Sequence, residues 1–450
     1  MNRLPVPGLS ETLQVICFFS ILLVPLAAVG LALINTGLGR ARSASHMMLA
    51  SLCVISLGAL MYFACGFAFQ GFVEAPSHNF SLAGKEWNVL GGMGLCFRGM
   101  GFIPGFPDLL AWFVMFSAGL AAVIPLGSGA DRWRLGACCA STAFLAGWTY
   151  PLFAHWVWGG GWLAQLGVNC SLGHGFIDVA GSSSIQAVGG LTALSIAWIL
   201  GPRRSKYAAD EMPTAIPGHN IVLSLLGCFL AWLGWLGLNV AGAILYVQAG
   251  FADVPLIAVN STLSAAAAAL SAVAITRARF RKPDASLSVN GWIGGLVASS
   301  AACTFLRPSG AVLVGLGAGI IVTLAVEWIE TRLGVDDPGG AVSVHVLGGV
   351  CGVLSVGLLA PVTRPVLNVA SPLLSGTENG GTGQWVAQLI GVATLLGFVL
   401  PLTYGLNWLL NRFYPMRVDA ESEQQGMDLS ELGADAYPEF LTRTEDFRLR

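Results

Sequence analysis

Long apolar stretches alternate with short polar loops along most of the chain. Each stretch approaches the length of about 20 residues that a helix needs to cross the hydrocarbon core of a bilayer. The pattern predicts eleven membrane-spanning helices, and the chain is therefore expected to be an all-α integral membrane protein. The expected spans are 12–34, 47–71, 107–129, 135–158, 181–200, 218–247, 253–276, 286–303, 310–332, 342–361 and 385–409.

The composition agrees with this interpretation. The 450 residues are 55% hydrophobic and 10% charged, whereas soluble domains carry roughly 25% charged residues. Arg3 precedes the first apolar stretch, as it would in a secretory signal peptide. That stretch is longer than a signal core and has no clear cleavage site, so we expect it to be retained as a helix.

Basic residues predict the orientation of the chain in the membrane, because they concentrate in cytoplasmic loops. One set of alternating loops contains most of them: Arg40, Arg42, Arg132, Arg134, Arg203, Arg204, Lys206, Arg277, Arg279, Arg281, Lys282 and Arg332. The other set contains only Lys85, Arg98, Arg307 and Arg364. We therefore expect the N-terminus outside and the C-terminus inside.

The chain divides into a predicted transmembrane domain, 1–410, and a cytoplasmic tail, 411–450, that has no membrane-length apolar run. The tail is rich in acidic residues. It is either a solvated tail or a segment that docks on the cytoplasmic face.

One polar pattern occurs twice, at the starts of the fifth and tenth predicted spans. It reads D-x-x-G-x-x-S-[IV]-[QH]-x-[VL]-G-G and covers 178–190 and 337–349. With an odd number of spans, these two helices run in opposite directions, so the copies are inverted. Interrupted helices at corresponding positions in the two halves of a transporter indicate a substrate site at the repeat interface.

The polar residues within the repeat are Gln186 and His345. Each lies about two helical turns, or about 12 Å, beyond the aspartate that begins its copy, which predicts that the two meet near the bilayer midplane. Both side chains offer hydrogen-bond donors and acceptors, and a polar residue in lipid is by default a functional candidate. The alternative is that they only join helices. Asn239 is a further polar residue inside an apolar span, and we expect it to line the pore and to bridge the broken end of the sixth span.

Trp158 and Asp178 are expected at the outer mouth, where an aromatic face and a carboxylate attract a small cation. The alternative for Trp158 is an interfacial aromatic belt. The alternative for Asp178 is a helix N-cap, a role that is compatible with attraction of a cation. Asp337 has the corresponding helix-start position in the second copy.

The chain has ten cysteines, most of them in apolar spans, where they are expected to be small buried hydrophobic residues. There is no C-x-x-C pair, so we expect no metal site. Cys96 and Cys170 both fall in predicted outside loops, and a disulfide between them remains an alternative.

These residues and their surroundings resemble the ammonium transporter family (Amt/Mep/Rh). The resemblance covers most of the chain, from the first helix to the tail. It rests on Ala154–Gly161, Asp178–Gly181, Gly218–Asn220 with Gly234–Asn239, Val335–Pro338, Ser343–Gly349 and the tail around Gly426–Gly433.

The resemblance implies an eleven-helix subunit with a 5+5 inverted repeat, assembled as a homotrimer with one pore in each subunit of a cytoplasmic-membrane protein. It implies ammonium recruitment at Trp158, helped by Asp178 and an outer gate at Phe116. It also implies a narrow apolar pore that carries ammonia or ammonium, a tail that docks a P-II-like regulatory protein, and no cofactor.

Three positions depart from the family pattern. Gln186 stands where the first of two pore histidines is expected, and Leu238 replaces the inner gate phenylalanine. Gly242 replaces the serine of the recruitment site, which removes one hydrogen bond to the bound cation. Because Gln186 carries no proton, these departures argue against proton hopping between two imidazoles.

The function expected is ammonium transport, with deprotonation of the cation at the outer mouth, since a bare cation is costly at the bilayer centre. The alternatives are an ammonium sensor that conducts poorly and a channel for a neutral gas such as carbon dioxide. The sequence has no nucleophile–base arrangement and no phosphate-binding glycine loop, which excludes an enzyme or an ATP-driven pump. Nothing in it indicates nucleic-acid binding.

Overall fold

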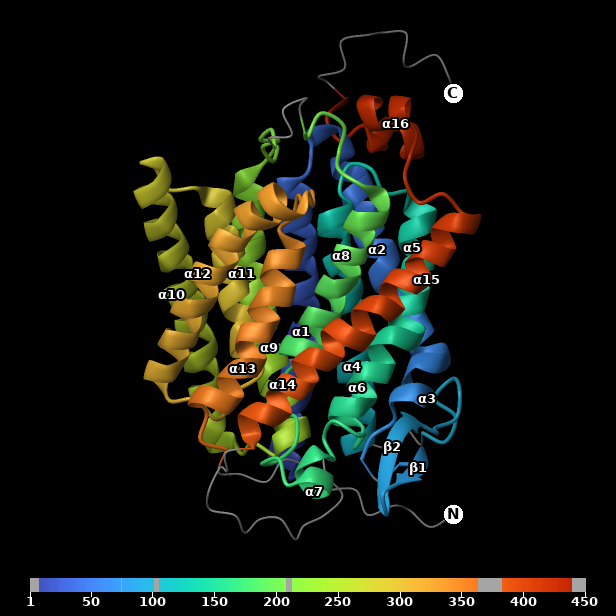
Figure 1. Cartoon of the computed structure of the whole chain (residues 1–450), viewed down its shortest axis with the longest axis vertical. Coiled ribbons are helices and arrows are strands. Elements are labelled where there is room, and N and C mark those ends of the chain that lie inside the picture. Colours follow the sequence, from blue (N-terminus) through green and yellow to red (C-terminus); the bar gives the residue numbers. More distant parts are fainter. Residues whose placement is uncertain (1–7, 74, 101–104, 208–212, 363–382, 439–450) are drawn as a thin grey trace.

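The computed structural model describes the chain except for residues 1–7, 74, 101–104, 208–212, 363–382 and 439–450. Arg3, which precedes the first apolar stretch, and Arg364, one of the basic residues in the predicted outside loops, lie outside the described residues. The end of the predicted tail lies outside them too. The chain forms a bundle of long helices (Figure 1).

The helices follow the predicted apolar stretches closely. In chain order they are α1 (Glu11–Leu38), α2 (Ala44–Met61), α3 (Phe67–Gln70), α4 (Phe106–Gly129), α5 (Leu135–Phe144), α6 (Tyr150–Trp158), α7 (Leu166–Cys170), α8 (Val188–Leu200), α9 (Ile221–Val247), α10 (Val254–Phe280), α11 (Ala285–Ser299), α12 (Pro308–Leu333), α13 (Gly348–Leu359), α14 (Gln384–Thr394), α15 (Leu400–Phe413) and α16 (Ala420–Gln425). Turns of π-helix lie within or before these helices at Tyr62–Gly66, Leu145–Thr149, Ser182–Ala187, Val342–Leu347, Leu395–Val399 and Asp428–Leu432. Short 3₁₀ turns occur at Ala41–Ser43 and Phe251–Asp253.

Helices occur at all eleven predicted ranges. Within the described part of the chain, nine are long and apolar enough to cross a membrane. The other two are the helix that α5 and α6 form with the π-turn between them, and α11, which has 15 residues and ends at Ser299 rather than at 303. That these two also cross the bilayer stays a prediction.

The expectation of an all-α chain missed one element, a two-stranded antiparallel sheet. Its strands are β1 (Ser77–Leu82) and β2 (Lys85–Gly91), joined by a tight turn in which Ala83 and Gly84 have positive φ. The hairpin is mostly exposed and lies in a loop between spans, where apolar length carries no information.

Figure 1 shows the hairpin and α7 at one end of the bundle and α16 at the other; we call these the hairpin end and the tail end. Helix α1 packs along α9, while α10, α11 and α12 pack against one another. Helices α14 and α15 run obliquely across the bundle (Figure 1). The two copies of the repeat therefore start at opposite ends, because Asp178 lies beside the end of α6 and Asp337 beside the last turn of α4.

The described part of the tail packs against the bundle, which supports the docking interpretation for those residues. The carboxylate of Asp428 accepts hydrogen bonds from the backbone N–H groups of Ser45 and His46, at 3.1 and 2.7 Å. Glu431 accepts one from the N–H of Leu135 at 2.7 Å. Acidic side chains near a helix N-terminus complement its unpaired N–H groups. The tail thereby fixes the starts of α2 and α5.

All ten cysteines are described, and all are free. Cys96 and Cys170 are both exposed and unpaired, so the disulfide alternative is not formed in this structure.

Candidate functional site

The first copy of the repeat begins at Asp178, whose buried carboxylate caps the π-turn Ser182–Ala187. Its Oδ1 accepts hydrogen bonds from the N–H groups of Gly181 and Ser182, both at 2.9 Å. Its Oδ2 accepts from the N–H and the hydroxyl of Ser183 and of Ser184, at 2.6 to 3.2 Å. The carboxylate therefore pairs the first N–H groups of the helix, as an N-cap would, although the N-cap residue itself is Gly181. Because protein donors surround both oxygens, the carboxylate organises the backbone of the site rather than presenting itself to a ligand.

The second copy begins with the same arrangement, an aspartate carboxylate that accepts hydrogen bonds at the start of a π-turn. Asp337 accepts a hydrogen bond from the Ser128 hydroxyl at 2.6 Å, and others from the N–H groups of Ala341 and Val342 at 3.0 and 2.7 Å. It caps a π-turn at Val342–Leu347 that matches the turn of the first copy. The sequence pattern did not predict these turns, which occur frequently at functional sites.

The polar residues of the two copies meet. Oε1 of Gln186 lies 2.8 Å from Nδ1 of His345, and both side chains are buried. Since a carboxamide oxygen only accepts, Nδ1 carries the hydrogen and donates it, which leaves the imidazole Nε2 with its lone pair. The amide nitrogen of Gln186 has no partner. The predicted meeting is confirmed, and the pair offers an unpaired donor next to an imidazole acceptor.

Glycines allow the two copies to approach so closely. A Cβ at Gly190 would lie 3.0 Å from the Cβ of His345 and 2.9 Å from the backbone nitrogen of Val346. A Cβ at Gly349 would overlap the carbonyl oxygen of Ser182 in the other copy. The last residues of the repeated pattern therefore set the distance at which its polar residues meet.

An aromatic cluster lies at the hairpin end beside Asp178. The indole Nε1 of Trp158 donates to the backbone carbonyl of Asp178 at 2.6 Å. The ring of Tyr246 stacks on the indole, with centroids 4.5 Å apart and an interplanar angle of 10°. Phe113 meets both rings edge-on, at 6.5 and 6.0 Å. Trp158 is only 2% exposed, so the interfacial-belt interpretation is wrong.

Phe116 does not lie in this cluster, contrary to its expected place at the outer gate. It is partly exposed and packs against Trp112, at 5.5 Å between centroids. Phe113 lies three residues earlier, and that offset on a helix changes the side chain's direction by about 60°. A sequence pattern rich in aromatic residues does not resolve that difference.

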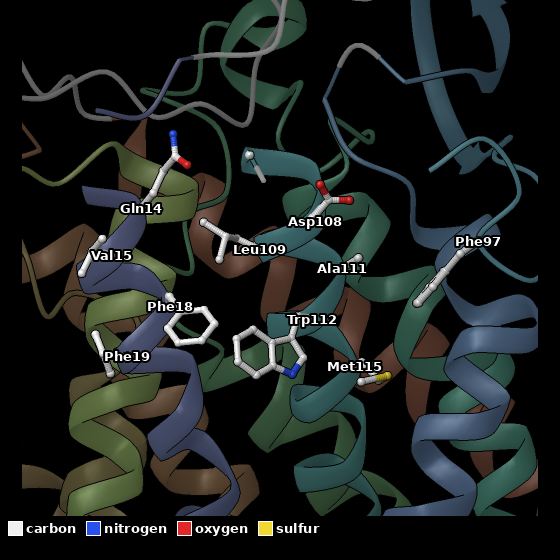
Figure 2. Close-up of a pocket in the computed structure, with 11 residues that line it drawn as sticks. Gln14, Val15, Phe18, Phe19, Phe97, Asp108, Leu109, Ala111, Trp112 and Met115 are labelled. Atoms are coloured by element: carbon white, nitrogen blue, oxygen red, sulfur yellow. The ribbon is translucent and has the colours of Figure 1, made fainter. Parts of the chain in front are cut away.

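Trp112 lines an apolar groove of about 680 Å³ between α1 and α4, on the surface of the helix bundle. Figure 2 shows Phe18 of α1 facing Trp112 across it, and their ring centroids are 5.3 Å apart. Phe18 and Phe19 are 43% and 61% exposed. A broad apolar surface of this kind does not suit a single small cation, so the candidate site is the buried cluster.

Leu238 and Asn239 are buried in α9. The amide nitrogen of Asn239 donates to the hydroxyls of Ser261 and Ser299, at 2.7 and 3.3 Å, and so joins α9 to α10 and α11. This is the bridging role expected from the sequence. Neither residue lines the cavity described below beside His345.

Gly242 lies where α9 meets the start of the first repeat copy. A Cβ there would lie 2.8 Å from the carbonyl oxygen of Val179 and 2.9 Å from the Cβ of Ala180. Backbone atoms surround the position, so a larger residue requires the segment that carries Asp178 to move.

Gly242→Ser is therefore expected to impair the protein, although it restores the family's hydroxyl. We expect a lower melting temperature and no gain in apparent ammonium affinity, because the added Cβ displaces the 178–180 backbone. Thermal unfolding and ammonium titration of the purified variant measure both effects. Gly317→Ser is the matched control, since a Cβ at Gly317 in α12 meets no atom within 4 Å. A stable Gly242→Ser protein that binds ammonium more tightly than wild type would show that this close contact is not limiting.

A small cavity adjoins His345 on the side toward the tail end. Its volume is about 10 Å³, about the room that one water-sized molecule needs. Apolar side chains form most of its wall, with Asn35 and Asn290 as polar exceptions: Leu31, Ile34, Asn35, Ile124, Asn290, Ile293, Gly339, Ala341, Val344 and His345. The cavity and the aromatic cluster lie toward opposite ends of the bundle, with the central pair between them.

Two glutamines of α14 position the first copy, and the sequence analysis missed them. Gln388 accepts from the N–H of Ile177 at 2.9 Å and donates to its carbonyl at 2.8 Å. Gln384 donates to the carbonyl of Gly175 at 2.8 Å. Their spacing of one helical turn in an apolar span is a signal that was available, because buried amides in lipid need partners.

Buried ion pairs fix the start of the second copy. Arg203 bonds both oxygens of Asp336 at 2.9 and 3.0 Å, and it reaches Asp131 at 3.0 Å. Burial alone would raise the pKa of Asp336, but the guanidinium of Arg132 and the bonds from Arg203 together lower it to about 2. The pairs thereby hold Asp337, the next residue, where it caps the π-turn.

Within the described part of the chain, no three metal-ligating side chains come together. What the structure offers is a polar pair enclosed in an apolar bundle, with aromatic rings on one side of it and a cavity on the other. Such an arrangement suits a small solute that forms a few hydrogen bonds.

Comparisons with known proteins indicate one family. A family model described as the Ammonium Transporter Family matches residues 15–437. The chain is 36% identical over 434 residues to the ammonium transporter Amt2 of Archaeoglobus fulgidus, which covers 96% of this chain and 88% of the relative. It is 30% identical over 434 residues to the ammonium transporter of Bacillus subtilis, with coverages of 95% and 98%. A solved structure described as a sensor Amt protein matches with a TM-score of 0.81 and 29% identity, over 93% of this chain and 98% of that one.

Proposed function

The chain belongs to the ammonium transporter family, and from this premise we propose that it moves ammonium or ammonia across the membrane through a narrow pore in each subunit. It is a transporter and not an enzyme. The observation that carries the proposal is the Gln186–His345 pair, which joins the two inverted copies and keeps an unpaired amide donor.

Recruitment takes place at the aromatic cluster. The indole of Trp158 attracts the cation through its π face, and the phenyl ring of Phe113 covers the same site in the role expected of Phe116. Asp178 has a structural role. Its carboxylate holds the backbone of the first repeat copy, and its backbone carbonyl accepts the hydrogen bond that orients the Trp158 indole. The carboxylate also favours a cation nearby through its field.

The cation releases its proton to water at the outer mouth before it reaches the centre, because a bare charge is costly there. Ammonia has one lone pair and three N–H groups. The unpaired amide of Gln186 donates to that lone pair, and Nε2 of His345 accepts from an ammonia N–H. Because Gln186 replaces an imidazole, no proton passes between the two side chains. Leu238 and Asn239 support the apolar wall of this path.

Eleven helices cross the membrane, including α11 and the helix of α5 and α6, with the two five-helix halves inverted. The N-terminus is outside and the C-terminus inside, in the cytoplasmic membrane. Large apolar side chains remain exposed on the helices, for example Phe19 and Val222, at 61% and 72%. Lipid and two further subunits of a homotrimer cover them.

Residues 1–410 form the transport domain and 411–450 the regulatory tail. The tail contacts the starts of α2 and α5 through Asp428 and Glu431. A P-II-like regulatory protein that binds this end of the molecule changes those contacts and thereby the pore.

Transport is tested with purified protein in liposomes by the uptake of labelled ammonium. Saturable uptake above that of empty liposomes is the expected result, whereas binding without uptake would support the sensor alternative. That alternative is not favoured, because the curated relatives that match most of the chain are described as ammonium transporters.

A further inference from the structure

A second apolar groove, of about 490 Å³, lies between the end of α6 and the span that α14 and α15 form. Among the described residues, no charged side chain lines it. Trp156 and Trp162 form one side, and one face of α14 with the π-turn that follows forms the other. Trp156 meets Phe398 of that turn with ring centroids 4.9 Å apart, so the two elements touch at the groove. Neither the central pair nor the aromatic cluster lines it, so the groove is separate from the proposed path.

The span beside this groove has the features of a helix that lipid surrounds. The segment Gln384–Phe413 is long and apolar enough to cross a membrane, and it runs obliquely across the bundle (Figure 1). Trp385 and Trp408, near its two ends, are 48% and 53% exposed. Aromatic side chains collect at the two membrane interfaces, and the helix between these tryptophans is about 34 Å long, close to the roughly 30 Å of a hydrocarbon core. The groove lies in the half nearer Trp385 and the hairpin end.

The groove has one unpaired donor, at its rim. Trp162 follows α6, is half-buried, and meets Trp156 edge-on at 5.8 Å between centroids. Within the described part of the chain, its indole N–H donates to no protein group. The N–H of Trp156 is occupied by the carbonyl of Val89, and the Thr394 hydroxyl donates to the carbonyl of Ile390, both at 2.8 Å. A donor at one end of an otherwise apolar groove suits an amphiphile.

Gly397 keeps the groove open. It lies in the π-turn Leu395–Val399 and lines the groove. A Cβ added at this position would meet no atom within 4 Å. Any larger side chain at Gly397 would therefore occupy the groove without displacing the helices around it.

We propose that this groove holds one acyl chain of a phospholipid from the leaflet at the hairpin end, with the Trp162 N–H donating to an oxygen of the lipid's glycerol linkage. The inference rests on the proposed membrane placement and not on the transport step. The face from Ile390 to Phe398 is about 12 Å long, close to the roughly 15 Å of one leaflet's hydrocarbon. The uncharged lining favours the chain, and the indole N–H favours its polar end.

The test counts lipids on purified, detergent-solubilised protein by native mass spectrometry, with palmitoyl-oleoyl phosphatidylcholine titrated as the probe. Gly397→Leu is expected to weaken binding of one phospholipid per subunit by about tenfold, the effect of losing roughly 55 Å² of apolar contact. Gly405→Leu is the matched control, because Gly405 is exposed on the same span and a Cβ there also meets no atom within 4 Å. It should bind lipid like wild type. Both variants should keep the wild-type melting temperature and ammonium uptake.

Trp162→Phe tests the polar end, since it keeps an aromatic ring and removes the N–H. Affinity for the probe is expected to fall roughly 2- to 12-fold, as for the loss of one hydrogen bond.

Equal lipid binding in wild type and Gly397→Leu, or an equal loss in Gly397→Leu and Gly405→Leu, would overturn the assignment. A change in the number of subunits in Gly397→Leu, with its lipid count unchanged, would also overturn it and identify the groove as a contact between copies of the chain. Wild-type protein that retains the lipid but takes up no labelled ammonium would instead reject the proposed function and leave the lipid site intact.

Discussion

Asp178→Ala is expected to abolish ammonium transport almost completely. The change removes the acceptor for four backbone N–H groups and two serine hydroxyls, all in the π-turn that carries Gln186 or at the glycine just before it. Each buried group left unpaired costs about 1–3 kcal/mol, so the turn does not keep its conformation. The Asp178 carbonyl, which orients the Trp158 indole, moves with it. Uptake of labelled ammonium into liposomes measures the loss.

Two controls separate this effect from a general loss of charge. Asp178→Asn keeps one acceptor oxygen and the side-chain volume, so partial transport is expected. Asp419→Ala removes an exposed carboxylate that caps only the short helix α16, and transport is expected at the wild-type rate. Normal uptake of labelled ammonium by Asp178→Ala would show that the cap is not needed for the pore.

Gln186→Leu is expected to lower ammonium flux by roughly 5- to 150-fold. Leucine removes the acceptor of the His345 Nδ1–H and the free amide donor, so a buried ring hydrogen is left unpaired. A penalty of about 1–3 kcal/mol on the permeating state corresponds to roughly 5- to 150-fold in rate. Initial rates at saturating ammonium are the measurement.

Gln186→His is the matched control for this prediction. An imidazole provides both a donor and an acceptor, so ammonium flux is expected to persist. If Gln186→Leu conducts like wild type, the pair only joins helices and takes no part in the path. If Gln186→His conducts where wild type does not, the glutamine blocks the pore and the sensor alternative gains support.

The sequence predicted the helices well because apolar length alone determines where a chain can cross a bilayer. It also predicted the contact between Gln186 and His345, since the repeat places them at equal depth in inverted copies. Residues within one span were harder to assign. Phe113 and Phe116 differ by less than one turn, and only packing determines which of them faces Trp158.

Other features depend on contacts that no local pattern encodes. The stack of Tyr246 on Trp158 joins helices far apart in sequence. The basic residues that predict orientation are not all free at the surface: Arg132 and Arg203 are buried, and Arg203 pairs with Asp131 and Asp336. Counting charges indicates which loops share a side, but it does not show that these arginines also fix the second repeat copy.

The most direct test of the central claim is the uptake of isotopically labelled ammonium into liposomes that contain the purified protein, at mildly acidic pH. Under these conditions the cation predominates and leakage of ammonia through lipid is small. Saturable uptake by wild type that is absent in Asp178→Ala and in empty liposomes is the predicted result. Wild-type uptake equal to that of empty liposomes, in protein that still binds ammonium, would contradict a transport function.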